Sequence, residues 1–220
     1  MSKSLNPQWI VGFVDGEGCF HIDVHRNKDC KWGLQIQPEF TVVQHERDQP
    51  LLQRFIQYFG CGNVTQNRQD ETSCRVQYRV KNLKALLQEK SPTEPNSKTG
   101  IIPFFVKHRL QTKKNIEFRK FRKVCLNLDS EKHLKSLSDF LDIVEKARSM
   151  RLNPSKKRNS GRSDGLEQHI EKLKTIRDLL KDQGLLGNPE AENAEWQNLK
   201  RQLETTSKVT YSSFVGNLKN

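Results

Sequence analysis

The chain has 220 residues, of which 34% are hydrophobic and 29% are charged, and its formal net charge is +12. This length suits one domain with a sizeable core plus an appendage, and the positive charge indicates a polyanionic partner. The sequence has no apolar run of about 18 residues, which excludes a transmembrane helix, and its polar N-terminus does not resemble a signal peptide. Five scattered cysteines without a Cys-x-x-Cys pair argue against zinc ligation and a disulfide framework, so a reducing compartment is expected.

The first predicted element is an apolar helix that begins after Asn6, a favourable N-cap, with Pro7 at its first position. One stripe of this helix, at spacings of three and four residues, holds Trp9, Gly12, Phe13 and Gly16. Because glycine has no side chain, we expect this stripe to pack closely against a partner helix. The helix ends in two acids, Asp15 and Glu17, and such packing would place Glu17 at the bottom of the contact.

From residue 19 the sequence alternates between apolar and polar residues, which predicts two strands separated by a turn at residues 27–29. The inward residues of these strands are Phe20, Ile22, Val24, Leu34 and Ile36. Pro38 interrupts the second strand, and we expect a bulge or an edge position there. A helix from Asp48 to Phe59, stopped by Gly60, follows.

The remaining elements complete an α+β pattern. They are strands near residues 63–67 and 74–80, and helices at 82–87, 101–109, 111–126 and from Leu134 through Val144. The resulting core order, αββαββα with further helices behind it, predicts a sheet that helices cover on one face. The other face of the sheet is polar and meets water or a ligand.

A change in composition divides the chain into three parts. Residues 151–165 form a basic linker between a core at residues 1–150 and a C-terminal helical extension at residues 166–220. Leu166, Ile170, Leu173 and Ile176 define an amphipathic helix in the extension. The last thirty residues hold few strong apolar positions and are expected to be peripheral.

The polar residues of the alternating segments form a candidate DNA-reading face. They are His21, Asp23, His25, Gln35, Gln37, Glu39, Thr41, Thr65, Asn67, Arg75, Gln77 and Arg79. A merely solvated face more often carries Lys and Glu, whereas most of these side chains make directional hydrogen bonds to base edges. Asp23 and Glu39 argue mildly against DNA, although either can accept a hydrogen bond from cytosine. An ordinary wet sheet face is the alternative interpretation.

A basic stripe also favours a nucleic-acid partner. Residues 107–123 hold eight Lys or Arg residues and one acid, Glu117, and most of the cations lie opposite the apolar Phe118 and Phe121. The linker adds Lys156, Lys157, Arg158 and Arg162. Such a stripe would neutralise phosphates and position a duplex, unless it is simply a solvated helix face.

The acid pair suggests a metal site. Mg²⁺ is bound in octahedral oxygen coordination by one or two carboxylates together with phosphate and water, and two such ions suit phosphodiester hydrolysis. One chain supplies one Glu17, so packing of the glycine stripe against a symmetry mate would bring two Glu17 carboxylates together. The alternative is that Asp15 and Glu17 only cap turns, which is the stronger interpretation for Asp15.

Residues Ile10–Gly18, reading IVGFVDGEG, resemble the signature of the LAGLIDADG homing endonucleases, in the single-motif form that works as a homodimer. The resemblance covers roughly residues 5–150, and further similar segments are Gly18–Ile22, Phe40–His45, Leu110–Phe118 and His133–Met150. Ile10 and Val11 replace the Leu-Ala of the family name, and Glu17 replaces its final Asp, which keeps the carboxylate.

The resemblance implies a four-stranded, antiparallel, saddle-shaped sheet over the DNA major groove, with the motif helices at the dimer interface. It implies that Glu17 and the Gly16 carbonyl bind the metal and that the catalytic residues are Glu17, Gln44 and Lys113. Lys107 and Lys114 are the alternatives to Lys113. The family places a basic residue one turn after the glutamine, where this chain has Asp48 with Arg47 beside it.

The expected function is therefore that of a homodimeric, Mg²⁺-dependent, site-specific endonuclease encoded by a mobile group I intron. It would make a staggered cut in both strands of a long, partly palindromic DNA target. A maturase that binds its intron RNA and a DNA-binding protein without cleavage activity are the alternatives, and a pure binder need not keep Glu17, Gln44 and a lysine. The expected location is a chloroplast or mitochondrion that itself encodes the protein, with no membrane partner.

Overall fold

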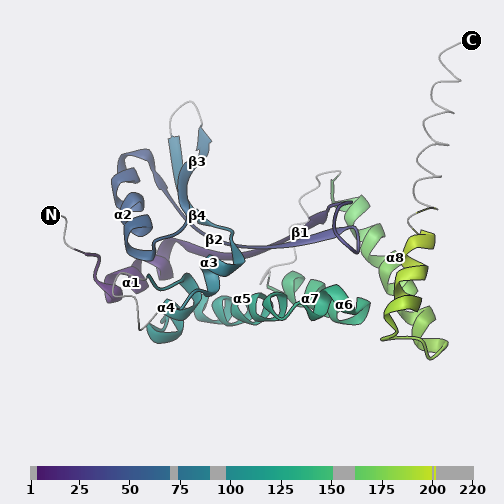
Figure 1. Ribbon diagram of the computed structural model, residues 1–220. Helices are drawn as coiled ribbons and strands as arrows, with labels where there is room; N and C mark the ends of the chain where they lie inside the picture. The colour runs from purple at the N-terminus through teal and green to yellow at the C-terminus, as the bar shows by residue number, and fades with distance from the viewer. Residues whose placement is uncertain (1–3, 70–73, 90–97, 151–161, 200, 202–220) are drawn as a thin grey trace, which may run out of the picture. The chain divides into compact units, whose positions relative to one another are not determined.

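The computed structural model describes residues 4–69, 74–89, 98–150, 162–199 and 201 (Figure 1). Its helices and strands are α1 (Pro7–Glu17), β1 (Gly18–Arg26), β2 (Leu34–His45), a 3₁₀ turn (Glu46–Asp48), α2 (Gln49–Phe59), β3 (Asn63–Gln69), β4 (Cys74–Val80), α3 (Leu83–Leu87), α4 (Ile101–Lys107), α5 (Lys114–Asp129), α6 (Lys132–Lys135), α7 (Leu137–Arg148) and α8 (Arg162–Asp182). Residues 189–199 are also helical. None of the helices within these ranges is long and apolar enough to cross a membrane.

The chain divides into two compact units. The core unit consists of residues 1–25, 35–130 and 143–154, and the second unit consists of residues 26–34, 131–142 and 155–220. The turn between β1 and β2 therefore belongs to the second unit, although both strands lie almost entirely in the core unit.

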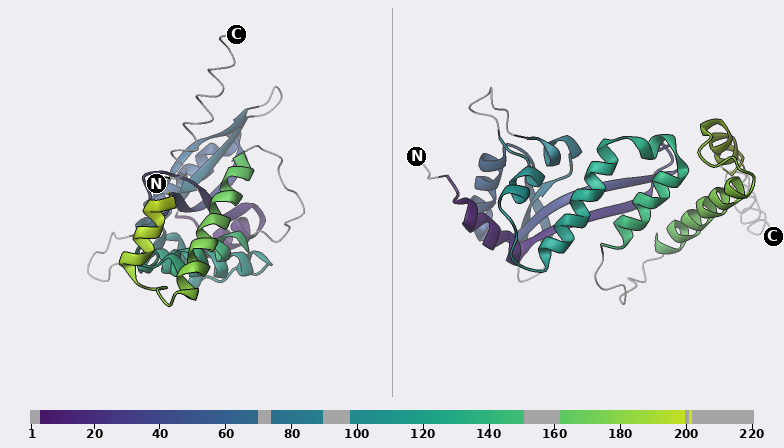
Figure 2. Two further views of the ribbon diagram at one scale, coloured as in Figure 1. Left: turned by 90° about the vertical axis from the view of Figure 1, so that its right-hand side faces the viewer. Right: turned by 90° about the horizontal axis from the view of Figure 1, so that it is seen from below.

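The core unit contains one four-stranded sheet with the strand order β1-β2-β4-β3. β2 pairs antiparallel with β4, from Phe40 opposite Val80 to His45 opposite Arg75, and β3 also pairs antiparallel with β4. Helices pack on one face of this sheet, and α5 runs across β1 and β2 (Figure 2, right panel). The predicted α+β fold with a four-stranded antiparallel sheet is confirmed.

The hydrophobic core lies between the sheet and the helices. The ring of Phe20 on β1 is 5.1 Å from that of Phe40 on β2 and 5.2–5.6 Å from those of Phe105, Phe118 and Phe121 on the helices. The alternation predicted for β1 is confirmed, because Phe20 and Ile22 are buried while Cys19 and Asp23 are exposed. This contrast gives the sheet an apolar face and a polar face.

The caps of two core helices form as the sequence predicts. Asn6 Oδ1 accepts hydrogen bonds from the backbone N–H groups of Gln8 (2.8 Å) and Trp9 (3.3 Å) at the start of α1. Gly60 ends α2 in the left-handed conformation (φ 69°), and its N–H donates to the Ile56 carbonyl. Both arrangements satisfy backbone groups that a helix leaves without partners.

Several predicted helix boundaries are wrong. The helix predicted from Gln111 starts at Lys114, the helix predicted to 109 ends at Lys107, and the helix predicted around Leu134 divides into α6 and α7. The last thirty residues are not all peripheral, since Trp196 is only 5% exposed. Of the linker predicted at 151–165, residues 151–161 lie outside the described residues, as do residues 202–220, and residues 162–165 belong to α8.

Pro38 neither ends nor breaks β2, which runs through it as one strand. The ladder between β2 and β4 begins at Phe40, so Pro38 lies just outside it. A proline there costs no hydrogen bond to β4, which fits the predicted edge-like environment.

Candidate nucleic-acid interface and metal centre

The end of α1 combines an exposed carboxylate with free helix carbonyls. Glu17 is the last residue of the helix and is exposed, and the Gly18 N–H donates back to the Val14 carbonyl. The carbonyls after Val14 have no partner within the helix, and the negative end of the helix dipole lies there without a basic residue in the last turn. Glu17 and the Gly16 carbonyl thus offer hard oxygen donors at a position that favours a cation.

Asp15 has a different role from Glu17, because its carboxylate holds the segment that leads into α5. Oδ2 accepts a hydrogen bond from the Gln111 N–H (2.8 Å), and Oδ1 accepts from the Thr112 N–H (3.3 Å) and hydroxyl (2.7 Å). These bonds hold Gln111 and Thr112 in the segment before the helix, and Thr112 Oγ1 accepts a hydrogen bond from the Lys114 N–H (3.2 Å), where α5 begins.

The three candidate lysines have different environments. Lys114 is half-buried and donates a hydrogen bond from Nζ to the Gly18 carbonyl, directly after the motif helix. Lys113 is exposed at the N-cap of α5, and Lys107 is exposed at the end of α4. The structure thus brings the Lys114 ammonium, among the three, to the end of α1.

The Cys19 thiol lies at the start of β1, beside this site. Although the residue as a whole is exposed, the protein around its sulfur excludes part of the water and so raises the pKa of the Cys19 thiol above its ordinary value. The negative charge of Glu117 raises this pKa further, while Lys114 lowers it. The thiol is therefore neutral at physiological pH, which does not suit a nucleophile or a metal ligand.

Gln44 lies near the end of β2, opposite Val76 of β4, and its side chain is half-buried. The basic residue that follows it is engaged locally: Arg47 Nε is 3.7 Å from the Asp48 carboxylate, and both side chains are exposed. An exposed pair of this kind contributes little to stability, so Arg47 can be released to a phosphate at small cost.

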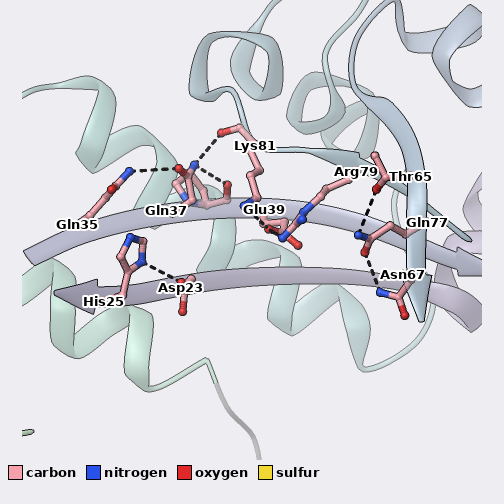
Figure 3. Close-up of polar contacts among 11 residues, drawn as sticks. Asp23, His25, Gln35, Gln37, Glu39, Thr65, Asn67, Gln77, Arg79 and Lys81 are labelled. Carbon is pink, nitrogen blue, oxygen red and sulfur yellow. Dashed lines mark hydrogen bonds and ion pairs between the residues drawn. The ribbon is translucent and has the colours of Figure 1, made fainter. Parts of the chain in front are cut away.

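The polar face of the sheet carries an ordered network of side chains (Figure 3). Glu39 Oε2 accepts a hydrogen bond from Arg79 Nη2 (2.7 Å) and lies 3.5 Å from Lys81 Nζ. Two cations therefore neutralise the carboxylate that argues against a DNA partner in the sequence. On β1, Asp23 Oδ2 lies 2.9 Å from His25 Nδ1.

Amide side chains extend this network on both sides of the face (Figure 3). Gln77 accepts from Asn67 Nδ2 (3.0 Å) and donates to the Thr65 hydroxyl (3.4 Å). Gln37 Nε2 donates to the Lys81 carbonyl (2.9 Å), and Gln37 Oε1 accepts from Gln35 Nε2 (3.4 Å). Such bonds fix the orientation of donors and acceptors before any ligand arrives.

The other predicted members of this face differ in exposure. Thr41 and Gln77 are both only 8% exposed, so neighbouring side chains cover much of them. His21 is half-buried, while Arg75 is exposed. The predicted residues lie on one face, but they do not contribute equally to its surface.

A β-bulge in β3 adds a residue to the polar face that the sequence pattern does not predict. The register of β3 against β4 shifts between Gln66 and Arg68, so that Arg68 rather than Asn67 lies opposite Arg75. Residues directly opposite in an antiparallel ladder point to the same face, which places two arginines side by side on the polar face. Because the bulge breaks strict alternation, no periodicity in the sequence could have shown this position.

The basic stripe lies in the helical layer rather than on the polar sheet face. α4 and α5 form a groove of about 640 Å³ whose lining includes Arg109, Arg119, Arg122 and Lys123 together with the exposed apolar residues Val106 and Leu126. Lys120 of α5 donates to the Ser149 carbonyl (2.9 Å). The expectation that this stripe neutralises phosphates and positions a duplex stays a prediction.

The glycine stripe of α1 is open. A Cβ placed on Gly12 or Gly16 meets no described atom within 4 Å. Beside these glycines Trp9 is 42% exposed and stacks on Phe13, with ring centroids 4.8 Å apart. An apolar helix face with room for a second backbone is typical of a helix–helix contact.

Comparison with known proteins gives the family. The model of the LAGLIDADG endonuclease family matches residues 10–125. The "probable intron-encoded endonuclease 2" of Neurospora crassa is 28% identical over 152 residues, which are 69% of this chain and 30% of that protein. This chain spans less than a third of the length of the first curated relatives that it matches.

Solved structures share the fold. A crystal structure of the homing endonuclease I-TnaI matches with a TM-score of 0.60 at 36% identity, over 78% of this chain and 99% of that one. I-SmaMI, bound to an uncleaved DNA target in the presence of calcium ions, matches with a TM-score of 0.60 at 26% identity, over 76% of this chain and 49% of that one. The family match includes the motif helix, all four strands and most of α5, and this chain belongs to the LAGLIDADG endonuclease family.

Proposed function

We propose that this protein is a site-specific, metal-dependent DNA endonuclease that works as a symmetric pair of chains. The observation that carries the proposal is the position of Glu17, exposed at the end of α1 where β1 begins the polar sheet face. The junction of α1 and β1 thus places a carboxylate that can bind a metal next to a surface that can form hydrogen bonds with base edges. The family and the intron-encoded relative in N. crassa support this assignment.

The donors at this junction fit Mg²⁺. Glu17 supplies a carboxylate, Gly16 supplies a carbonyl without a helical partner, and phosphate and water would complete an octahedral shell. When bound, the metal supplies charge neutralisation at the scissile phosphate and a more acidic water. I-SmaMI was solved with calcium ions and DNA, which supports a divalent cation as the cofactor.

Two further side chains are proposed to act beside the carboxylate. Gln44 would orient a water near the scissile phosphate through its amide. Lys114 would steady the same water network, because its ammonium reaches the Gly18 carbonyl at the end of the motif helix. This position favours Lys114 over Lys113 as the catalytic lysine.

A pair of chains would complete the site. The open face of Gly12 and Gly16 accommodates a second α1, and the shared axis would bring two Glu17 carboxylates near each other. The match to I-SmaMI takes in about half of that chain, which supports a partner of similar size for the core of this one. Two sites related by symmetry would cut both strands, with a stagger, in a partly palindromic target.

Selection from a randomised DNA library tests the proposal. Purified protein would be incubated with the library and Mg²⁺, and the cut ends would be sequenced. We expect one long, partly palindromic site, staggered ends and loss of cutting when a chelator replaces the metal. Selective binding without cleavage in any divalent metal would instead identify a DNA-binding protein that lacks endonuclease activity.

The basic groove between α4 and α5 favours a second candidate function, the binding of intron RNA. Its cations lie in the helical layer, so a polyanion there need not displace DNA from the sheet face. We expect replacement of Arg119 and Arg122 by Ala to weaken binding of the host intron RNA while leaving cleavage of the DNA site within about threefold. Competition between RNA and the DNA site for one surface would exclude this candidate.

We also propose an organellar location, because the family resemblance and the intron-encoded N. crassa relative both suggest an intron-borne gene. Sequencing of the DNA around the gene tests this. A group I intron in mitochondrial or chloroplast DNA is the expected result, and a nuclear gene without an intron boundary would contradict it.

A further inference from the structure

The β1–β2 hairpin extends beyond the four-stranded sheet. The ladder between β2 and β4 stops at Phe40, and residues 34–39 of β2 continue past it toward the turn (Figure 1). We call residues 21–26 and 34–39 the distal ribbon. It carries half of the candidate base-reading side chains, namely His21, Asp23, His25, Gln35, Gln37 and Glu39.

The support that this ribbon receives from the hydrophobic core of the core unit weakens along its length. Phe20 and Ile22 belong to that core and Val24 and Ile36 are only partly buried against it, whereas Leu34, next to the turn, is buried (2% exposed) outside that core, within the second unit. A two-stranded ribbon is marginally stable in water unless a third element supports it. A slip of one residue would also turn every reading side chain to the opposite face. The far end of the ribbon therefore needs a separate anchor.

The second unit provides that anchor at the turn. Trp32, in the turn, is 1% exposed, and its ring lies 6.3 Å from Phe140 and 6.4 Å from Trp196. Its indole N–H donates to the His133 carbonyl (3.0 Å), and Lys31 Nζ donates to the Leu134 carbonyl (2.6 Å). A tryptophan at a hairpin tip would otherwise expose a large apolar surface to water.

The backbone of the turn is held as well as its side chains. The Trp32 carbonyl lies 2.9 Å from His169 Nε2, which must carry the hydrogen because a carbonyl only accepts. Gly33 has φ 68°, and a Cβ there would lie 2.9 Å from both the His169 and the Trp196 rings. The turn closes with the Asn27 N–H donating to the Gly33 carbonyl (2.9 Å). The C-terminal helices thus contact the main chain at the point where the two strands are joined.

A buried carboxylate ties these C-terminal helices together. Glu192, fully buried, accepts from the Leu137 N–H (2.8 Å) at the start of α7 and from the Gly187 N–H (3.0 Å). Two charge-assisted bonds to backbone groups compensate for the burial of its charge. All of these helical residues lie after residue 125, where the match to the family model ends.

We propose that the C-terminal helices form a clamp that fixes the distal ribbon and thereby sets base specificity at the outer positions of the DNA half-site. His169, Trp196 and Trp32 are positioning residues in this clamp, and they act through the strands rather than by contact with DNA. The specificity part rests on the proposed DNA-binding function. The clamp itself is a property of the free protein and can be measured without DNA.

Hydrogen exchange of the free protein tests the clamp. We expect Trp196→Ala to speed exchange of the distal-ribbon amides by about tenfold or more, with the ladder of β2 and β4 unchanged. Leu179→Ala, a matched change of an exposed leucine on α8, should leave the ribbon as it is. His169→Gln keeps an amide donor for the Trp32 carbonyl and should resemble the wild type more than His169→Ala does.

If Trp196→Ala melts the whole second unit, faster exchange of the amides of that unit will show the melting. The amides of the distal ribbon should then also exchange faster than in the wild type. A ribbon that keeps its protection in a variant whose second unit has melted would overturn the proposal.

Cleavage of targets that vary at one base pair at a time tests the specificity part. Trp196→Ala should relax discrimination by about tenfold at the outer positions of each half-site and by less than about twofold at positions next to the cut. Uniform relaxation at all positions, together with a loosened ribbon, would overturn the specificity part. A loosened ribbon in a protein that neither binds nor cuts DNA would refute the proposed function and leave the clamp intact.

Discussion

At the scale of single residues, two carboxylates two positions apart on one helix have opposite uses. Asp15 accepts three hydrogen bonds from the segment before α5, so its oxygens are already engaged. Glu17 is exposed at a helix end whose last carbonyls have no partner within the helix. Experiment can therefore separate a structural acid from the proposed metal-binding acid.

Glu17→Gln is expected to abolish cleavage while DNA affinity stays within about threefold, because it removes a metal ligand and no base contact. The loss in rate should reach at least about 1,000-fold, which corresponds to several kcal/mol of transition-state stabilisation. Single-turnover cleavage and binding assays in Mg²⁺ measure both quantities. Asp15→Asn is the matched control, and it should instead lower the free energy of unfolding by about 1–2 kcal/mol. A fully active Glu17→Gln variant would remove this residue from the mechanism.

The neighbouring lysines allow a similar comparison. Lys114→Met should slow cleavage by about 100-fold, since the ammonium at the end of the motif helix is lost, whereas Lys113→Met should change the rate by less than about fivefold. Rates measured at saturating protein separate this effect from binding. The opposite ranking would assign the catalytic lysine to Lys113.

At the scale of elements, alternation and caps predict most of the sheet, because each depends on residues close in sequence. These local signals alone predict both the bounds of β4 and the end of α2 at Gly60. The start of α5 could not be predicted, since it depends on Asp15, 96 positions before Gln111. The bulge at Asn67 could not be predicted from the sequence either, because it breaks the two-residue alternation on which strand prediction rests.

Basic residues on the polar sheet face and basic residues in the helical layer should differ in their effect on DNA recognition. Arg75→Ala should cost about 1–3 kcal/mol of discrimination at one base pair, because its side chain is exposed on the polar face opposite Arg68. Lys120→Ala should have little effect on any target, because Lys120 donates to the Ser149 carbonyl in the helical layer. Binding to a set of single-base variants of the site measures both. A uniform loss of affinity from Arg75→Ala would make it a phosphate contact instead.

The second unit should lose stability in acid because of His169. Burial lowers the pKa of its imidazole below the ordinary 6.5, and the nearby Arg26 and Lys172 lower it further, against the opposing effect of the Trp32 carbonyl. The unfolded chain therefore takes up the proton first, so stability is complete above about pH 6.5 and falls as the pH drops below it. Hydrogen exchange of α8 across this range measures the effect, and His169→Gln should remove it. Greater protection at lower pH would contradict the assignment.

At the scale of the whole molecule, the least predictable feature is that the hairpin turn belongs to the second unit. Trp32 lies in a short polar turn and Trp196 in a segment with few apolar residues, so neither position suggests a core in sequence. Their contact joins residues more than 160 positions apart, which local patterns do not report. The glycine stripe of α1 is the opposite case, because its spacing of three and four residues is visible in the sequence, and its packing against a second chain stays a prediction.

That open face leads to a prediction about assembly. If two α1 helices pack through Gly12 and Gly16, Gly12→Leu should prevent their close approach and convert the dimer to a monomer without unfolding it, since a Cβ at Gly12 meets no described atom within 4 Å. Sedimentation equilibrium with and without the DNA site measures the mass, and circular dichroism checks the fold. Ile116→Leu, on an exposed position of α5, is the matched control and should stay dimeric. Because each chain carries one Glu17, the monomer should also lose double-strand cleavage. A wild-type chain that cuts both strands as a monomer would require the second carboxylate to come from elsewhere.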